Sequence, residues 1–136
     1  MKKLITLLAT AALAFNASAG MVVIGNPAGV DSLSEGDVKQ LFMGKQTRLS
    51  NGQTAAIVEL NDGAEGRITF HSVATGRSES QLQSGWSRLV FTGKAEAPIQ
   101  VADYSAMLAE IAKNPNAIGY ADESAIDGSV KVLFKY

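Results

Sequence analysis

The chain has 136 residues, of which 46% are apolar and 18% charged, and this apolar content excludes an intrinsically disordered chain. Twelve basic and 13 acidic side chains leave a formal net charge of −1, which disfavours a nucleic-acid partner because no excess of positive charge is present. Cysteine is absent, so disulfides, thiolate metal ligands and thiol nucleophiles are excluded together.

The first 19 residues have the pattern of a secretory signal peptide. Two lysines precede an apolar run over residues 4–15, and Ala17 and Ala19 follow with the small-x-small spacing of a cleavage site. The run is too short to cross a bilayer, which takes roughly 20 apolar residues. We therefore predict cleavage after Ala19, periplasmic localisation, no stable membrane insertion after cleavage, and one domain over residues 20–136.

The first half of the predicted mature domain contains signals for two strands and two helices. Apolar runs predict the strands, and Ser34 with Asp37 three residues later predicts a capping box at the start of the first helix. Glycines follow both helical patterns at the position that favours a left-handed backbone. The expected elements are a strand at 21–24, a helix from Ser34 to Gly44, a strand at 54–60 and a helix from Ala64 to Gly76.

The second half repeats the alternation of helices and strands. Ser78 with Gln81 predicts another capping box, and Trp86 lies on the apolar stripe of the helix that follows, together with Leu82, Leu89 and Val90. We expect Trp86 to be a core residue. The remaining expected elements are a strand at 99–101, a helix capped by Asp103 or Ser105, and strands at 117–120 and 129–134. This order predicts an α/β fold with one sheet flanked by helices on both faces.

Catalytic and metal-binding signals are weak in this sequence. His71 is the only histidine and adjoins Ser72 in the predicted helix over residues 64–76. Adjacent helical residues point in different directions, so the two side chains are badly placed to act as base and nucleophile. No metal-ligand spacing, phosphate loop or dinucleotide glycine pattern is present. We predict no enzymatic activity, no metal site and no cofactor, with His71 as a surface or packing residue.

The segment 61–67 is the best candidate for a binding site. It joins the carboxyl end of a predicted strand to a helix start, where open α/β sheets bind ligands and where free N–H groups suit an anion. Gly63 and Gly66 let a ligand approach the backbone. Arg67 can bind an oxyanion bidentately, and Asp62 can accept a proton from a protonated oxyanion. The predicted ligand-binding residues are therefore Asp62, Gly63, Gly66 and Arg67.

A structural interpretation of the same segment is also open. Asp62 caps the helix in that case, Glu65 complements the helix dipole, and Arg67 is a solvated side chain on the exposed face.

Several stretches, taken in order, resemble the phosphate-type periplasmic substrate-binding proteins of ABC transporters. Among them are Phe42 to Lys45, which reads phenylalanine-x-glycine-lysine, and Asn114 to Tyr120, which reads asparagine-proline-x-alanine-isoleucine-glycine-tyrosine. The ordered set covers most of the predicted mature chain. Its members are residues 33–34, 38–45, 51–52, 67–70, 86, 91–94, 98 and 114–120.

The resemblance implies a type-II periplasmic-binding-protein fold. Full-size members have two α/β lobes with the anion in the cleft between them, whereas this chain has room for a single lobe and its matches look like the second one. The implied fold is thus one lobe with a mixed sheet flanked by helices on both faces. The implied function is an exported module that binds phosphate or a related oxyanion for an ABC transporter. The implied partners are that small oxyanion and either an ABC permease or a second protein chain.

The anion loop departs from the family pattern, in which an arginine and an aspartate precede serine-glycine-threonine at a helix start. Asp62 and Gly63 fit that pattern. The substitutions are Glu59 or Leu60 for the arginine, and Ala64 with Glu65 or Gly66 for the hydroxyl residues. The missing hydroxyl donors support an alternative function, a periplasmic protein-interaction module that keeps the lobe fold and has lost anion binding.

Overall fold

The computed structural model describes residues 20–136, so the predicted signal peptide over residues 1–19 lies outside the described residues. Within residues 20–136, no helix combines the length and the hydropathy needed to span a bilayer. The predicted α/β class is confirmed. The elements in chain order are β1 (Met21–Gly25), α1 (Glu35–Phe42), β2 (Ala56–Leu60), α2 (Glu65–Ala74), α3 (Glu79–Phe91), β3 (Ile99–Val101), α4 (Tyr104–Ala112), β4 (Ala117–Asp122), the short 3-10 helix η1 (Glu123–Ala125) and β5 (Lys131–Lys135).

The strands form one mixed sheet, as predicted, in the order β3-β2-β4-β1-β5. β2 pairs in parallel with β3 and β4, whereas β1 pairs antiparallel with β4 and β5. All five residues of β1 and the first five of β4 are buried, which is typical of strands covered on both faces. β3 is the short edge strand beside β2, so the end of the sheet nearest the candidate site is an edge.

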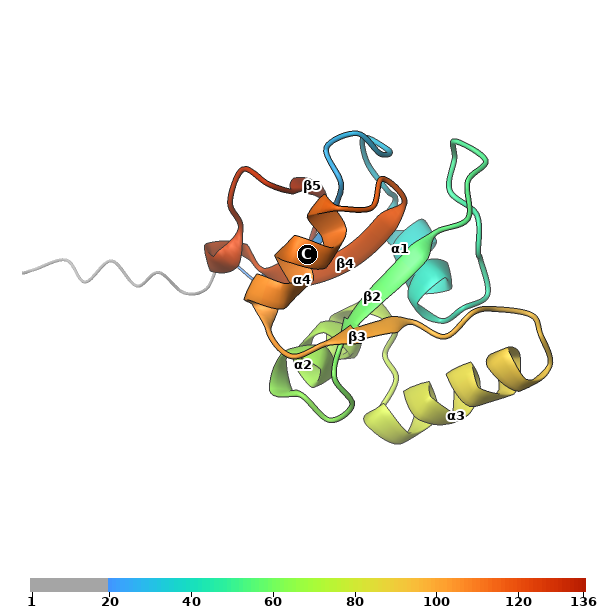
Figure 1. The fold of residues 1–136 in the computed structure, drawn as a ribbon. Helices are drawn as coiled ribbons and strands as arrows, with labels where there is room; N and C mark the ends of the chain where they lie inside the picture. The colour runs from blue at the N-terminus through green and yellow to red at the C-terminus, as the bar shows by residue number, and fades with distance from the viewer. Residues whose placement is uncertain (1–19) are drawn as a thin grey trace, which may run out of the picture.

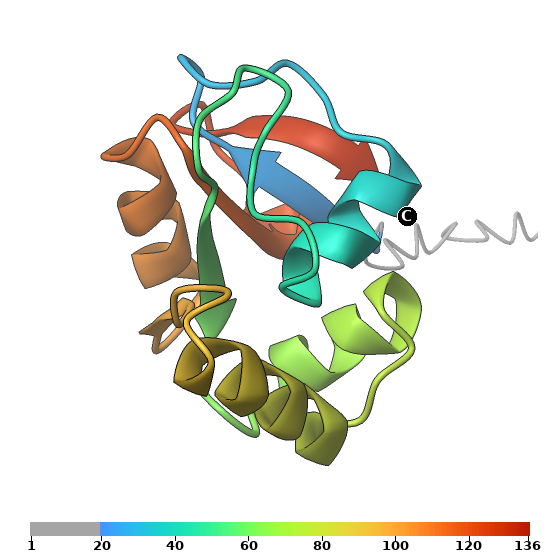
Figure 2. The same ribbon diagram turned by 90° about the vertical axis from the view of Figure 1, so that its right-hand side faces the viewer.

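Helices cover both faces of the sheet, which confirms that prediction (Figure 1 and Figure 2). α4 lies on one face, where a Cβ added at Gly119 would stand only 2.6 Å from the Met107 sulfur. α1 and α2 lie on the other face, where the ring of Phe70 stacks on Tyr120 with centroids 4.0 Å apart and meets Phe42 edge-on at 4.8 Å. α3 lies farther out, beyond β3, and buries only Leu82 and Trp86 (Figure 1).

Three of the four α-helices within residues 20–136 begin with a side-chain cap, and α2 does not. The two predicted capping boxes are confirmed, and α4 is capped by Asp103 rather than by Ser105. The N-cap residue of α2 is Ala64, which makes no side-chain hydrogen bond. Asp62 therefore does not cap this helix, and the first N–H groups of α2 lack both an intrahelical partner and a side-chain cap.

The buried face of α2 differs from the apolar face that the sequence suggests. Ile68 and Val73 are 50% and 52% exposed, although they are apolar residues of the helical pattern. Positions three and four residues apart share a helix face, and here the face directed at the sheet carries two polar side chains whose partners lie on β2 and α3. The buried residues of α2 are Arg67, Phe70, His71 and Ala74.

Candidate functional site

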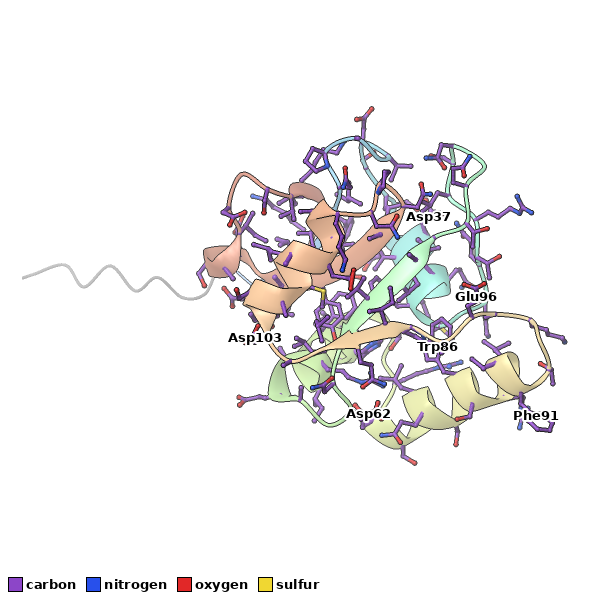
Figure 3. The ribbon with its side chains drawn as sticks, in the orientation of Figure 1. Asp37, Asp62, Trp86, Phe91, Glu96 and Asp103 are labelled. Carbon is purple, nitrogen blue, oxygen red and sulfur yellow. The ribbon has the colours of Figure 1, made fainter. Side chains whose placement is uncertain are left out.

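The candidate site lies where β2 ends and α2 begins. Gly63 has φ +78°, a left-handed backbone conformation that favours glycine, and nothing lies within 4 Å of the position that its side chain would take. The Asp62 side chain is 51% exposed, and its backbone N–H donates to Gln100 Oε1 at 2.9 Å. Figure 3 shows Asp62 below the end of β3, next to the start of α3. The turn thus presents an exposed carboxylate beside an uncapped helix start.

Arg67 is buried, which corrects the expectation of a solvated side chain on the exposed helix face. It is 3% exposed. Its Nε–H donates to Glu79 Oε1 at 2.9 Å, Nη1 donates to the Leu60 carbonyl at 3.3 Å, and Nη2 lies 3.3 Å from Asp62 Oδ1. A guanidinium tolerates burial only when its charge and its donors are satisfied, and the convergence of β2, α2 and α3 supplies these three partners.

The charge of Arg67 is already balanced by carboxylates. Burial raises the pKa of Glu79, but hydrogen bonds from Gln83 and Arg67, the positive charge of Arg67 and a hydrogen bond from the Gly63 backbone N–H lower it by more, so that the pKa lies below its ordinary value of 4.5. Asp62 and Glu79 together outweigh the single guanidinium, and Glu65 adds a third negative charge in the first turn of α2. The side chains around Arg67 thus carry a net negative charge, and the groups at this site that can donate to an anion are the backbone N–H groups at the start of α2.

Gly66 has a packing function that the sequence did not indicate. A Cβ at this position would stand 2.5 Å from the Tyr104 hydroxyl oxygen and 2.7 Å from Leu60 Cδ1. The glycine lets α2 approach α4 and the end of β2 closely. The space beside Gly66 is filled by protein, so a ligand reaches this residue only through its backbone N–H.

A cavity of about 420 Å³ opens beside this turn, between α3 and the segment that leads into β3. Asp62 and Arg67 lie at its polar end, and Trp86, Phe91 and Pro98 form apolar walls. The predicted core position of Trp86 is confirmed, because it is 8% exposed and its Nε1–H donates to the Phe42 carbonyl at 3.1 Å. Trp86 points from α3 toward β3 and Phe91 points away from the body of the protein (Figure 3).

His71 packs in the interior against a partner that the sequence did not identify. Its Nε2 lies 2.9 Å from Glu59 Oε2, and both side chains are fully buried. Tyr120 donates its hydroxyl proton to Glu59 Oε1 at 2.7 Å, and burial, followed by the charge of Glu59, raises the pKa of Tyr120. Thr75 Oγ1 lies 3.0 Å from His71 Nδ1. A glutamate within the apolar run 56–60 was the available sequence signal, since a buried carboxylate requires partners.

Ser72 is not paired with this histidine. The Ser72 hydroxyl donates to the Thr69 carbonyl at 2.7 Å, on the exposed side of α2, while His71 faces Glu59. Among residues 20–136, no group of three or more histidine, aspartate and glutamate side chains has the arrangement of a metal site.

The fold is that of one lobe of known phosphate-transport receptors. An ABC-type phosphate transport receptor from Vibrio cholerae superimposes with a TM-score of 0.67 at 22% identity, covering 84% of this chain and 45% of the receptor. A protein from Clostridium perfringens, described as a phosphate ABC transporter substrate-binding protein with bound phosphate, gives 0.64 at 20% identity, covering 84% and 44%. PstS from Borrelia burgdorferi gives 0.60 at 11% identity, covering 85% and 46%.

These neighbours confirm the predicted resemblance at the level of the fold. The chain spans less than half the length of each of them, which corresponds to a single lobe. They are transport receptors and binding proteins rather than enzymes, in agreement with the prediction that this chain has no enzymatic activity. No protein-family model matches the sequence, and no curated protein matches it.

Proposed function

We propose that this chain is an exported single-lobe module that binds phosphate or a related oxyanion for an ABC transporter. The observation that carries the proposal is the uncapped start of α2. The exposed Asp62 carboxylate lies beside this helix start, and the buried Arg67 guanidinium is paired with Asp62. The Clostridium perfringens protein is described with bound phosphate, and its similarity in fold supports phosphate as the ligand class of this lobe. The predicted signal peptide supports export.

The arginine–aspartate pair of the family pattern has a spatial counterpart here. The upstream arginine is replaced by Glu59 or Leu60, yet Arg67 reaches back from α2, donates to the Leu60 carbonyl at 3.3 Å and lies 3.3 Å from Asp62. A guanidinium from a different position in the chain thus lies against the same aspartate. This arrangement supports the hypothesis that an arginine–aspartate pair is kept at the binding site.

The local charge favours a protonated monoanion over a dianion. Backbone N–H groups at the start of α2 can donate to the ligand, whereas the carboxylates of Asp62, Glu65 and Glu79 repel it. Asp62 can accept a hydrogen bond from a protonated oxyanion, which distinguishes dihydrogen phosphate from sulfate. A second chain would close the other side of the site, because the lobe accounts for 45% of the Vibrio cholerae receptor.

Calorimetric titration of the purified chain with phosphate and with sulfate tests this function. We expect weak phosphate binding and weaker sulfate binding in the wild type. Arg67→Met should weaken phosphate binding, and Asp62→Asn should remove the preference for phosphate over sulfate. Asp31→Asn is the matched control, because Asp31 is 99% exposed and paired with Lys131 instead.

Two outcomes would overturn the function. The first is an absence of phosphate binding at millimolar ligand in a folded wild-type protein. The second is phosphate binding that both Arg67→Met and Asp62→Asn leave unchanged. Circular dichroism of each variant shows whether a loss of binding comes from a loss of folding. We expect Asp62→Asn to fold like the wild type, because the Asp62 side chain is half exposed.

Exposed apolar side chains favour the second candidate function, a periplasmic protein-interaction module. Phe91 is 92% exposed, Val90 39% and Ile99 38%, although Val90 was expected on the buried stripe of α3. Val90 and Phe91 lie at the end of α3 and Ile99 lies on the edge strand β3, and exposed apolar side chains and sheet edges are typical of protein contacts. Two results together would favour this function. The chain binds no anion, and a periplasmic protein co-purifies with the wild type but not with Phe91→Ser.

A further inference from the structure

A second cavity, at the other end of α2, carries only positive charge. It measures about 600 Å³ and is bordered by Lys45, Arg77 and Arg88. No aspartate or glutamate is among its lining residues in the described part of the chain. α2 has 10 residues and is therefore roughly 15 Å long at 1.5 Å of rise per residue, and the cavity is bordered by Gly76 and Arg77 just past its carboxyl end. We call it the basic pocket.

The three cations of the basic pocket are unpaired. Over residues 20–136, none of the ion pairs and none of the side-chain hydrogen bonds involves the charged group of Lys45, Arg77 or Arg88. Arg67 is the opposite case, since two carboxylates contact it. Solvated cations without an acidic partner remain available to an anion and create a positive potential that attracts it.

The pocket is built from three separate segments. Lys45 follows α1, Arg77 lies between α2 and α3, and Arg88 lies on α3. A Cβ added at Gly85 would stand 2.7 Å from Arg77 Nη1, so this glycine lets the guanidinium of Arg77 lie directly on α3. Ser84 and Gln81 add a hydroxyl and an amide to the lining.

The chemistry of the lining identifies the ligand class. Two guanidinium groups and one ammonium group match the oxygens of phosphate, which arginine binds bidentately. Three positive charges call for a ligand with several negative charges, and the volume lies in the usual range for small-molecule sites. We propose that the basic pocket binds a small molecule that carries two or more phosphate groups.

The test is calorimetric titration of the full chain with tripolyphosphate and, separately, with inorganic phosphate. Tripolyphosphate should bind the wild type more tightly than phosphate does, and its affinity should fall as ionic strength rises. Arg77→Gln and Arg88→Gln should each lower the tripolyphosphate affinity about three- to fivefold, the range expected when one exposed ion pair is lost. Lys94→Gln removes one positive charge outside the pocket and should change the affinity less than twofold.

Gly85→Ala provides a test that leaves every charge in place. The added methyl group displaces the Arg77 guanidinium from α3, so tripolyphosphate affinity should fall although the net charge is unchanged. Alanine is favourable within a helix, so this variant should fold as well as the wild type. An unchanged affinity would show that Arg77 does not bind from its position on Gly85, and would count against the pocket.

Three further results would overturn the proposal. One is no binding of tripolyphosphate at millimolar concentration. Another is an equal loss in Lys94→Gln and Arg77→Gln, which would indicate general charge attraction. The third is a loss in Arg67→Met with none in Arg88→Gln, which would assign the polyanion to the start of α2 and leave the proposed phosphate-binding function standing. If an acidic peptide binds the wild type and tripolyphosphate does not, the pocket binds a protein partner and the proposal is wrong.

Discussion

The two ends of α2 hold arginine side chains in opposite electrostatic states. At the amino end, Arg67 is 3% exposed and contacts two carboxylates and a carbonyl. At the carboxyl end, Arg77 and Arg88 border an open pocket and have no acidic partner among residues 20–136. Burial of a charge demands its neutralisation, whereas a solvated charge stays available. Arg67 is therefore mainly a structural cation, and the cations that remain available to a ligand lie at the other end of α2.

The buried pair of His71 and Glu59 holds α2 against β2 and thereby sets the positions of both ends of the helix. His71→Leu leaves Glu59 fully buried with Tyr120 as its remaining side-chain partner, and should lower the free energy of unfolding by about 3–5 kcal/mol. Ser72→Ala, on the exposed side of the same helix, should stay within about 0.5 kcal/mol of the wild type. Denaturant unfolding measures both. Wild-type stability in His71→Leu would mean that the pair does not anchor α2.

The next largest effect contrasts the two ends directly. Arg67→Met should destabilise the fold by about 2 kcal/mol, less than a fully enclosed pair would lose, because Asp62 and Glu79 retain partial exposure and can be rehydrated. Arg88→Met should change stability by less than about 0.5 kcal/mol, as exposed positions do. The same unfolding experiment decides, and equal effects at the two positions would remove the contrast.

A smaller effect concerns acid pH at the amino end. The pKa of Glu79 is lowered in the folded protein from its ordinary value of 4.5, so ionised Glu79 contributes stability that is present above that value. This contribution is lost as the pH falls through the folded pKa. The stability difference between the wild type and Glu79→Gln should therefore shrink as the pH is lowered below 4.5. A difference that stays constant over that range would exclude Glu79 as the titrating partner of Arg67.

The smallest expected effect is on anion affinity. Glu65 places a negative charge in the first turn of α2, so Glu65→Gln should raise phosphate affinity about two- to fivefold, in line with the energy of a charge near a helix terminus. Glu35→Gln changes the equivalent position of α1 and should leave phosphate affinity unchanged. Calorimetric titration gives both values. A decrease in Glu65→Gln would mean that Glu65 supports the ligand rather than opposing it.

The parts of the fold that follow from local sequence were predictable. The capping boxes at Ser34 and Ser78 join residues three positions apart, so a short stretch contains the whole signal. The apolar run that begins at Met21 forms a strand buried on both faces, and Trp86 lies in the core as its stripe indicates. The class of the fold and the single lobe followed from such signals and from the family resemblance.

The burial of the candidate site residues could not be predicted, because their partners are distant in the chain. Arg67 is buried by virtue of Glu79, 12 positions away, and Glu59 by virtue of Tyr120, 61 positions away. Helical periodicity alone places an arginine on the exposed side and an isoleucine such as Ile68 on the buried side. Tertiary partners reversed both assignments.

The basic pocket was hidden from the sequence for the same reason. Lys45, Arg77 and Arg88 belong to three segments, and only the fold brings them to one cavity. The overall charge of −1 gives no sign of a local cluster of cations.

Backbone amide shifts during titration with phosphate test the central claim most directly, because binding at the start of α2 rests on N–H groups. A nitrogen–proton correlation spectrum of the labelled chain, recorded over a phosphate series, follows each amide separately. We expect saturable shifts centred on Glu65 and Gly66 in the first turn of α2, with smaller changes elsewhere. Saturable shifts confined to residues 76–88, or no saturable shift at millimolar phosphate, would contradict it.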